Sequence, residues 1–129
     1  MPTSEQIRSA ADAYAAAVSS ADKSRILAQF AADATVVDPY PSPPHVGHEA
    51  IGGFWDIVLS MGTPKSFKIE KIAVAGDAAC FLFTLTVAVG EAGQLFGVSG
   101  FDVITVGDDG LISSLTAYWD PGQMAEVTG

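Results

Sequence analysis

An aspartate interrupts an apolar alternation in the C-terminal part of the chain. From Leu95 to Val106 every second residue shares one predicted strand face, and Asp102 is its one charged member, beside Phe96, Val98, Gly100, Ile104 and Val106. Burying an ionised carboxylate among apolar side chains is costly, so such a group binds a proton instead. We therefore predict that Asp102 is a neutral carboxylic acid and a hydrogen-bond donor. The alternative is a shifted register that leaves Asp102 in solvent.

Tyr14 and Asp38 are two further residues that could act together with Asp102. Tyr14 belongs to an apolar helical stripe, so its phenol should point into the fold, although a core tyrosine without a chemical role would do the same. Asp38 ends an apolar strand and precedes Pro39, a position that also suits a turn residue. As a set, an ionised carboxylate could move a proton while a phenol and a carboxylic acid stabilise the resulting oxyanion.

Other kinds of site have less support in the sequence. His45 and His48 are three residues apart but have no cysteine or obvious third ligand with them, so we expect no metal site. The motifs GxSxG, GxxxxGK(S/T) and GxGxxG do not occur, which argues against the common hydrolase, phosphate-loop and dinucleotide-binding classes. Cys80 has no nearby basic partner and is expected to be an inert thiol in the core.

Three helices are predicted in the first half of the chain. The first opens with Thr3 and Gln6 at the spacing of a capping box, and its apolar stripe comprises Ile7, Ala10, Ala11, Tyr14, Ala17 and Val18. A second, short helix carries Ile26, Leu27 and Phe30. The third covers residues 47–60, where two glycines, Gly52 and Gly53, each cost about 1 kcal/mol relative to alanine and suggest close approach by another element.

The remaining segments are predicted to be strands. A short strand at 35–38 precedes a proline-rich loop at 39–44. After residue 66 the apolar period becomes two, which predicts strands over 66–75, 78–89, 94–106 and 111–119. Glycine-containing turns separate these strands, so successive strands should be antiparallel neighbours. Helices followed by a long sheet indicate an α+β domain, and a curved sheet around helices leaves a cavity for a ligand.

Composition and charge restrict the class of protein further. The chain has 129 residues, 49% hydrophobic and 16% charged, which suits one folded domain (residues 1–129) and excludes a disordered chain. A net charge of −9 argues against nucleic acid or an anionic membrane as a partner. The single cysteine cannot form an internal disulfide, and neither a bilayer-spanning apolar run nor a signal-peptide pattern is present. We therefore expect a cytoplasmic protein.

The three candidate residues lie in segments that resemble the ketosteroid isomerases, steroid Δ5-isomerases whose cone-shaped fold is shared with nuclear transport factor 2 and the SnoaL-like cyclases. The segments are ADAYAAAV around Tyr14, FAADATVVDP around Asp38, and GFDVITVGDDG around Asp102, followed by LTAYWD. Their mutual spacing is similar to that of the family, and the resemblance extends through Trp119. It implies a cone-shaped NTF2-like fold in which three N-terminal helices pack on a curved antiparallel or mixed sheet.

The resemblance also implies an activity: conversion of 3-oxo-Δ5-steroids to 3-oxo-Δ4-steroids without a metal or organic cofactor. Asp38 would be the general base that takes a proton from C4 and returns it at C6. Tyr14 and protonated Asp102 would donate hydrogen bonds to the C3 oxygen of the dienolate, and an acid kept neutral for this purpose is a known property of the family. The implied partners are an apolar steroid and a second copy of the chain, and a positive mean hydropathy also suggests a homodimer.

Resemblance and alternation together place eight residues around the steroid, namely Val18, Phe54, Phe83, Leu85, Val98, Leu115, Ala117 and Trp119. The indole N–H of Trp119 is expected to bond to Asp38 and to lower the pKa of that carboxyl group. In some family members further tyrosines support the oxyanion tyrosine. Phe30 and Trp55 stand at those places here, so the supporting network differs.

Two other functions remain open. One is another enzyme on the same fold. Epoxide-opening members use a carboxylate–arginine–carboxylate cluster, which the only two arginines, Arg8 and Arg25, are poorly placed to form, whereas polyketide-cyclase chemistry needs groups similar to those present. The other is a non-catalytic protein that binds a steroid or another apolar molecule, because a fold does not decide a function.

Overall fold

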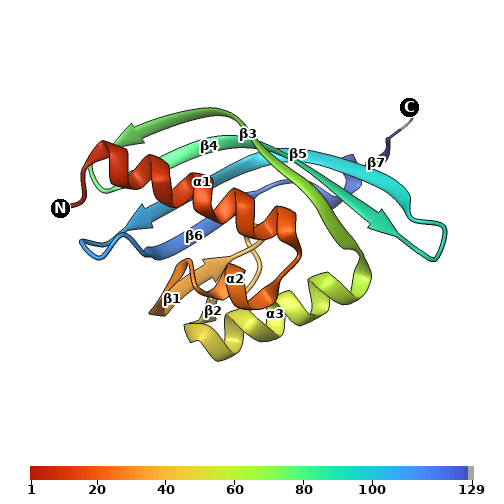
Figure 1. The fold of residues 1–129 in the computed structure, drawn as a ribbon, viewed down its shortest axis with the longest axis horizontal. Coiled ribbons are helices and arrows are strands. Elements are labelled where there is room, and N and C mark those ends of the chain that lie inside the picture. The colour runs from red at the N-terminus through yellow and green to blue at the C-terminus, as the bar shows by residue number, and fades with distance from the viewer. Residues whose placement is uncertain (128–129) are drawn as a thin grey trace.

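One mixed sheet bends around a layer of helices in the structure, a computed structural model that describes residues 1–127 (Figure 1). The helices are α1 (Ser4–Ser20), α2 (Lys23–Leu27), α3 (Gly47–Met61) and the short 3-10 helix η1 (Pro121–Gln123). The strands are β1 (Phe30–Val37), β2 (His45–Val46), β3 (Thr63–Ala75), β4 (Ala78–Val89), β5 (Gln94–Val106), β6 (Ile112–Tyr118) and β7 (Ala125–Glu126). Their order is β2-β1-β6-β5-β4-β3, and β7 pairs with β5. This arrangement agrees with the predicted α+β class.

Strands β1 and β6 form the one parallel pair in the sheet of residues 1–127. Val36 pairs with Leu115 and Val37 with Thr116, so the two strands run side by side toward the same edge. The segments that follow them therefore leave the sheet together. Asp38 follows β1, and Trp119 follows β6.

Helix α1 begins and packs as its sequence predicts. The Thr3 hydroxyl accepts a hydrogen bond from the Gln6 backbone N–H at 3.1 Å, and the Gln6 side chain accepts one from the Thr3 N–H at 2.8 Å. This capping box satisfies two of the N–H groups left free at a helix start. The predicted apolar stripe is buried along its whole length, which fixes the helix against the sheet with Tyr14 directed inward.

Strand β1 is longer than predicted, and it begins at Phe30, which was assigned to the second helix. Helix α2 already ends at Leu27. The register between β1 and β6 shifts between Phe30 and Thr35, so the intervening segment AADA bulges out of the regular ladder. Alanine and aspartate have low strand preference, and apolar and polar residues do not alternate in this segment. The first half of β1 was therefore not predicted from the sequence.

The antiparallel part of the sheet agrees closely with the prediction. Strands β4 and β5 have the predicted bounds, whereas β3 starts three residues earlier, at Thr63, and β6 is one residue shorter at each end. The β4–β5 turn contains Gly90 and Gly93, both with positive φ, the region that glycine adopts most easily. The two-residue strands β2 and β7 were not predicted, because two residues carry no periodicity.

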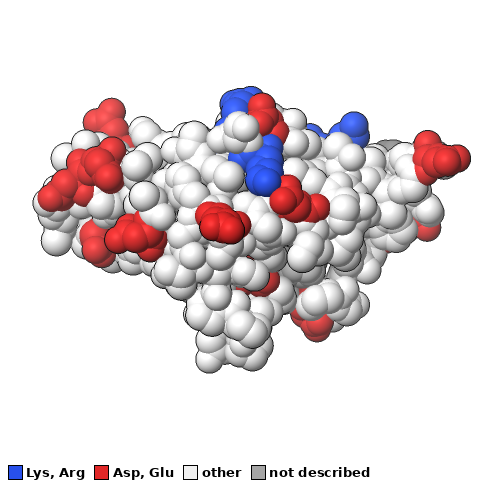
Figure 2. Space-filling model, turned by 90° about the horizontal axis from the view of Figure 1, so that it is seen from below, with Lys and Arg blue, Asp and Glu red and all other residues white. Residues whose placement is uncertain are grey.

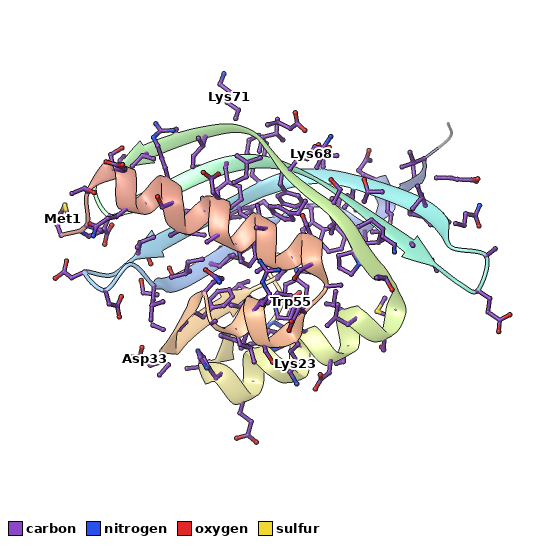
Figure 3. All side chains as sticks on the ribbon, viewed as in Figure 1. Met1, Lys23, Asp33, Trp55, Lys68 and Lys71 are labelled. Carbon is purple, nitrogen blue, oxygen red and sulfur yellow. The ribbon has the colours of Figure 1, made fainter. Side chains whose placement is uncertain are left out.

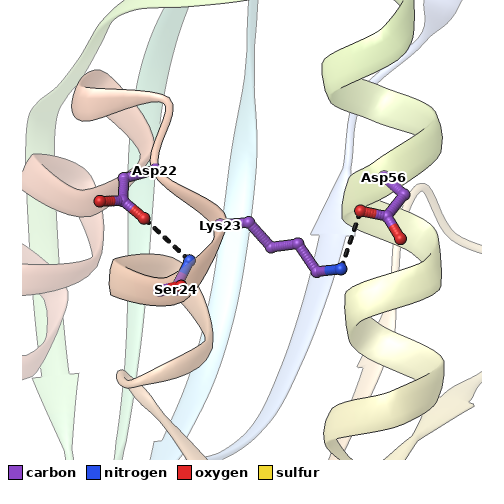
Figure 4. A network of polar contacts seen from close by, with 4 residues as sticks. All are labelled: Asp22, Lys23, Ser24 and Asp56. Atoms are coloured by element: carbon purple, nitrogen blue, oxygen red, sulfur yellow. Dashed lines mark hydrogen bonds and ion pairs between the residues drawn. The ribbon is translucent and has the colours of Figure 1, made fainter.

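Helices α2 and α3 approach each other closely at Gly52. A Cβ at Gly52 would lie 3.2 Å from Lys23 Cε and 3.5 Å from Leu27 Cδ1, so the glycine allows the contact that the sequence suggested. The Lys23 ammonium lies 2.8 Å from the Asp56 carboxylate of α3, and the backbone N–H of Ser24 donates to Asp22 (Figure 4). The ion pair is exposed and stabilises the contact between α2 and α3 by no more than about 1 kcal/mol. Gly53, in contrast, faces open space.

The core lies between α1, α3 and the inner face of the sheet. Trp55 points into this layer, whereas Lys68 and Lys71 extend from β3 into solvent (Figure 3). Among residues 1–127 the buried hydrophobic side chains other than Val98 form one cluster, and Asp102 is the one charged side chain that is buried, only 3% exposed. Helices of the described chain are all too short or too polar to span a membrane.

The outer surface corrects one prediction. Cys80 is exposed and not in the core, because its neighbours Ala79 and Phe81 are the buried members of the β4 alternation. Figure 2 shows acidic side chains spread over the face seen from below and basic ones in two places toward its upper edge.

Candidate active site

A cavity of about 70 Å³ lies between the helices and the sheet. It brings together the three residues that the sequence singles out, because Tyr14, Asp38 and Asp102 all line it. They come from α1, from the segment after β1 and from β5. A wider, more open groove beside the start of α1 holds none of these groups and is lined by Thr3, Glu5, Gln6, Ser9, Ala10, Ala13, Gln29 and Gly110. The enclosed cavity is therefore the candidate site.

Tyr14 is held as a protonated phenol in the wall of this cavity. Its ring makes edge contacts with Phe30 and Phe67, with centroid distances of 5.8 and 5.6 Å. Burial raises the pKa of the Tyr14 hydroxyl well above its usual value, and the nearby carboxyl groups of Asp102 and Asp38 raise it further. At neutral pH the phenol therefore keeps its proton and can donate it in a hydrogen bond.

Asp102 is a neutral acid by the same physics. Burial raises the pKa of its carboxyl group well above the usual value, and the negative charge of Asp38 adds to this effect. The residue is 3% exposed, and its cross-strand neighbours are Phe81 on β4 and Ala117 on β6. The predicted register is thus confirmed, and the alternative in which Asp102 faces solvent is excluded.

Asp38 differs from Asp102 because it has a donor of its own. The indole N–H of Trp119 donates a hydrogen bond of 2.7 Å to Asp38 Oδ1, as predicted. Burial raises the pKa of Asp38 from 3.8 to about 6, and the Trp119 hydrogen bond acts in the opposite direction. The half-buried carboxyl group is therefore mainly ionised at neutral pH but remains basic enough to accept a proton.

Most of the predicted wall is found at the cavity. Six of the eight predicted residues line it, namely Val18, Phe54, Phe83, Leu85, Val98 and Trp119. Leu115 and Ala117 do not line it. Both are 1% exposed and belong to the hydrophobic core, although they share the inner face of the sheet with Asp102. Their place in the steroid site stays a prediction: alternation identifies the inner face of β6, and the packing of the helices against the sheet decides which part of that face is open.

Four further residues line the cavity, namely Trp55, Val58, Pro64 and Phe67. Trp55 and Val58 are three residues apart on α3, the spacing of one helix face, so their periodicity was a usable signal. Phe67 alternates correctly within β3, but nothing in the sequence separates it from ordinary core. Pro64 precedes the predicted start of that strand, and no signal in the sequence pointed to it.

Trp55 has one unusual property. Its Nε1 is the one buried side-chain nitrogen or oxygen of residues 1–127 that has no hydrogen-bond partner. The other indole of the site, that of Trp119, is paired. Leaving a buried donor unpaired costs about 1–3 kcal/mol of stability.

The two histidines make separate contacts near the site. The His45 ring packs against Phe54 with a centroid distance of 4.9 Å, and His48 Nε2 lies 2.9 Å from the Phe30 carbonyl oxygen. The second contact attaches the start of α3 to β1. The contact between His45 and Phe54 supports one side of the cavity, because Phe54 lines the cavity.

The chain is similar to proteins of known kind along most of its length. Residues 11–115 match the SnoaL-like domain family. A protein named steroid Delta-isomerase from Nocardioides simplex is 35% identical over 122 residues, which are 94% of this chain and 95% of that protein. Among solved structures, RV0760c from Mycobacterium tuberculosis superposes with a TM-score of 0.82 at 21% identity, covering 98% of this chain and 100% of that one. A Delta 5-3-ketosteroid isomerase from Mycobacterium sp. gives 0.81 at 22% identity, covering 95% and 98%. The two solved structures confirm the predicted cone-shaped fold.

Proposed function

The chain belongs to the SnoaL-like domain family, and from this membership and the site we propose that it is a steroid Δ-isomerase acting on 3-oxo-Δ5-steroids. One observation carries the proposal. A single cavity holds two carboxyl groups of different acidity, Asp38 with a pKa of about 6 and Asp102 with a pKa raised well above its usual value. A proton transfer next to a carbonyl group needs this division, with one carboxylate to accept a proton and one acid to stabilise an oxyanion.

The proposed reaction has two proton-transfer steps. The Asp38 carboxylate removes a proton from C4, and the electron pair of the C–H bond passes through C3 to its oxygen, which gives a dienolate. Protonated Asp38 then returns the proton to C6. The double bond moves from C5–C6 to C4–C5, and the protein ends in its starting protonation state. No group outside the chain and the steroid takes part.

Tyr14 and Asp102 are the proposed donors to the C3 oxygen. Both keep a proton at neutral pH and both line the cavity that holds the base. A developing oxyanion is stabilised most by donors that are already oriented in a site from which water is excluded. Phe30 and Phe67 hold the Tyr14 ring in place by edge contacts.

The apolar wall supports a steroid as the ligand, although the empty cavity is small. Pockets for ligands of drug size measure about 300–1,000 Å³, well above the about 70 Å³ found here. We propose that half-buried wall residues, among them Phe54 and Leu85, move aside when the steroid enters, and that the rings farthest from the reacting carbonyl extend toward the mouth.

Epoxide hydrolysis has little support as an alternative, because Arg8 and Arg25 are exposed and neither lines the cavity. The test of the proposal is the ultraviolet absorbance of the conjugated enone formed from 5-androstene-3,17-dione. We expect the wild-type protein to form the enone, and Asp38→Asn to lower kcat by about 10²–10⁴-fold with little change in steroid affinity. Asp33→Asn is the matched control, since Asp33 is exposed on β1, the strand that Asp38 follows (Figure 3). Tight steroid binding without enone formation would identify a binding protein instead.

We also propose that the protein is a homodimer that pairs through the outer face of the sheet. Three exposed aromatic residues form a stripe there: Phe101 is the cross-strand partner of Tyr118, and the ring of Tyr118 lies 5.3 Å from that of Tyr40. Exposed aromatic clusters of this kind are typical of interfaces. Light scattering should give twice the chain mass, and Phe101→Lys should halve it, whereas Ile57→Lys on exposed α3 should not.

A cytoplasmic location is a further proposal. Cys80 is the single cysteine of the chain, and its exposed thiol suits a reducing compartment. Fractionation of the native host would test it, and recovery of the protein outside the cytoplasm would contradict it.

A further inference from the structure

Gly100 occupies the inner face of β5 next to Asp102 and opposite Phe83 of β4. It is the most crowded glycine in the described chain. A Cβ built on it would lie 2.6 Å from Trp119 Cβ, 2.7 Å from the Tyr118 carbonyl oxygen and 3.0 Å from Phe83 Cζ. Atoms that are not bonded do not approach a Cβ so closely, so this position excludes every other residue unless a neighbour moves.

The crowding arises where β6 ends. Tyr118 is still paired with Phe101 of β5, so the next residue, Trp119, would face Gly100 across the strands. Cβ atoms of facing residues are normally about 4.5–5.5 Å apart. Because the position of a Gly100 Cβ is only 2.6 Å from Trp119 Cβ, the backbone at Trp119 has moved in over β5 into space that a side chain would fill.

The close approach of Trp119 to Gly100 also affects the proposed general base, Asp38. The residue that crosses Gly100 is the one whose indole N–H reaches Asp38 Oδ1 at 2.7 Å, and its ring also lines the cavity. We propose that Gly100 is a positioning residue: its missing side chain lets Trp119 lie across β5 and donate its N–H to Asp38. The effect on the carboxyl group stands on geometry alone, and the effect on catalysis rests on the proposed isomerase function.

A methyl group at Gly100 could be accommodated only by displacing Trp119. Two of the three atoms it would meet are a Cβ and a backbone oxygen, which no side-chain rotation can remove. The third belongs to Phe83, whose ring is stacked on Phe67 with a centroid distance of 4.9 Å and is held there. The added methyl group would therefore displace the segment after β6. This displacement would move the Trp119 indole away from Asp38.

The first experiment compares Gly100→Ala with wild-type protein by NMR titration of the Asp38 carboxyl carbon, without steroid. The Trp119 hydrogen bond lowers the pKa of Asp38, so its loss should make Asp38 about tenfold weaker as an acid. The midpoint of the profile of kcat/KM against pH should move upward by about one pH unit, the same tenfold change. Gly97→Ala is the matched control on the same strand, because its added methyl would closely meet only a methyl group of the exposed Val127 side chain, at 3.0 Å. An unchanged Asp38 titration in folded Gly100→Ala would overturn the proposal.

The second experiment tests whether the effect passes through Trp119. Trp119→Phe removes the donor, so adding Gly100→Ala to this variant should leave the Asp38 titration where Trp119→Phe alone has put it. A further change of similar size would show that Gly100 acts by another route and would overturn the proposal. If the titrations behave as expected but no steroid is isomerised, the proposed function fails and the positioning role stands.

A third variant covers the case in which Gly100→Ala does not fold. Trp119→Gly removes the Cβ that the added methyl would meet at 2.6 Å and relaxes the backbone beside it. The double variant Gly100→Ala, Trp119→Gly should therefore recover a cooperative unfolding transition. A double variant that remains unfolded would overturn the assignment of the clash to Trp119.

Discussion

The charge of Asp38 raises the pKa of Asp102 across a cavity that both residues line. Asp38 titrates while Asp102 still holds its proton and carries no charge, so the pKa of Asp38 is set by its own burial and by the hydrogen bond from Trp119. Ionisation of Asp38 therefore strengthens the hold of Asp102 on its proton. Each carboxyl group is kept in the state that the proposed reaction requires, and the pair is best treated as one titrating unit.

The pH dependence of isomerisation follows from this pair. Activity should rise as the pH increases through about 6, because Asp38 is a base only when ionised. The plateau should end only where a donor loses its proton, and burial has raised the pKa of both Tyr14 and Asp102. The measurement is kcat/KM against pH, and a profile that falls as the pH passes through about 6 would contradict the assignment of Asp38 as the base.

Asp38→Asn should stabilise the protein at neutral pH. Folding raises the pKa of Asp38 from 3.8 to about 6, so its stability contribution is fully present below 3.8 and is lost as the pH rises through about 6. For a half-buried carboxyl group this loss amounts to about 1–3 kcal/mol, which neutral asparagine avoids. Urea unfolding at pH 7 and again near pH 4 measures it. The gain should shrink at the lower pH, and a variant that is less stable than wild type at pH 7 would contradict the raised pKa.

Tyr14→Phe should slow isomerisation while leaving the fold intact. Removal of the hydroxyl takes one donor from the oxyanion, which typically costs about 10²–10³-fold in kcat. Steady-state kinetics with the enone assay measure the loss. Tyr118→Phe is a matched control, because Tyr118 is exposed on the outer face of the sheet. Equal rates for the two variants would remove Tyr14 from the proposed mechanism.

Asp102→Asn should be milder than Asp102→Ala. A protonated carboxyl group and a carboxamide are both neutral donors of similar size, so asparagine should lose less than about tenfold in kcat. Alanine leaves no donor and should lose about 10²–10³-fold. The comparison reports the state of Asp102, because a group that acted as a charged carboxylate would be replaced equally poorly by both residues.

Trp55→Phe should have little effect on stability in the absence of ligand. The indole N–H of Trp55 has no partner, so its removal offsets part of the loss of buried apolar area, and we expect a change within about 1 kcal/mol. Trp119→Phe removes a paired donor to a charged group and should cost about 1.5–3 kcal/mol at neutral pH. Urea unfolding of the two variants at pH 7 tests this contrast, and equal losses would show that Trp55 has a partner in solution.

The alternation along β5 was enough to predict both the buried position of Asp102 and its neutral state, because both follow from one charged residue in an apolar row. The helical stripe placed Tyr14 in the same interior for an equally local reason. Asp38 has no comparable pattern. Its role was inferred from the resemblance, and the partner that sets its acidity is 81 residues away in the chain.

Local patterns could not show which parts of a buried surface are packed and which are open. Leu115 and Phe67 both alternate as inner-face residues, yet Leu115 is covered by the core and Phe67 lines the cavity. The difference depends on where helices far away in sequence cross the sheet. Cys80 is another case: its neighbours Ala79 and Phe81 define the inner face, so strict alternation gives its exposure correctly, and the preference of cysteine for interiors does not.

The parallel alignment of β1 and β6 fixes the distance between the Asp38 carboxyl group and the Trp119 indole. Asp38 and Trp119 follow adjacent strand ends that point the same way, whereas the β4–β5 turn is at the end of two long strands that are paired with each other. Changes to the wall residues of β4 and β5 that lie toward that turn, such as Leu85 and Val98, would reshape the cavity and leave the Asp38–Trp119 distance unchanged. A fold of this design can acquire new ligands through its sheet wall, with no need to rebuild its acid–base chemistry.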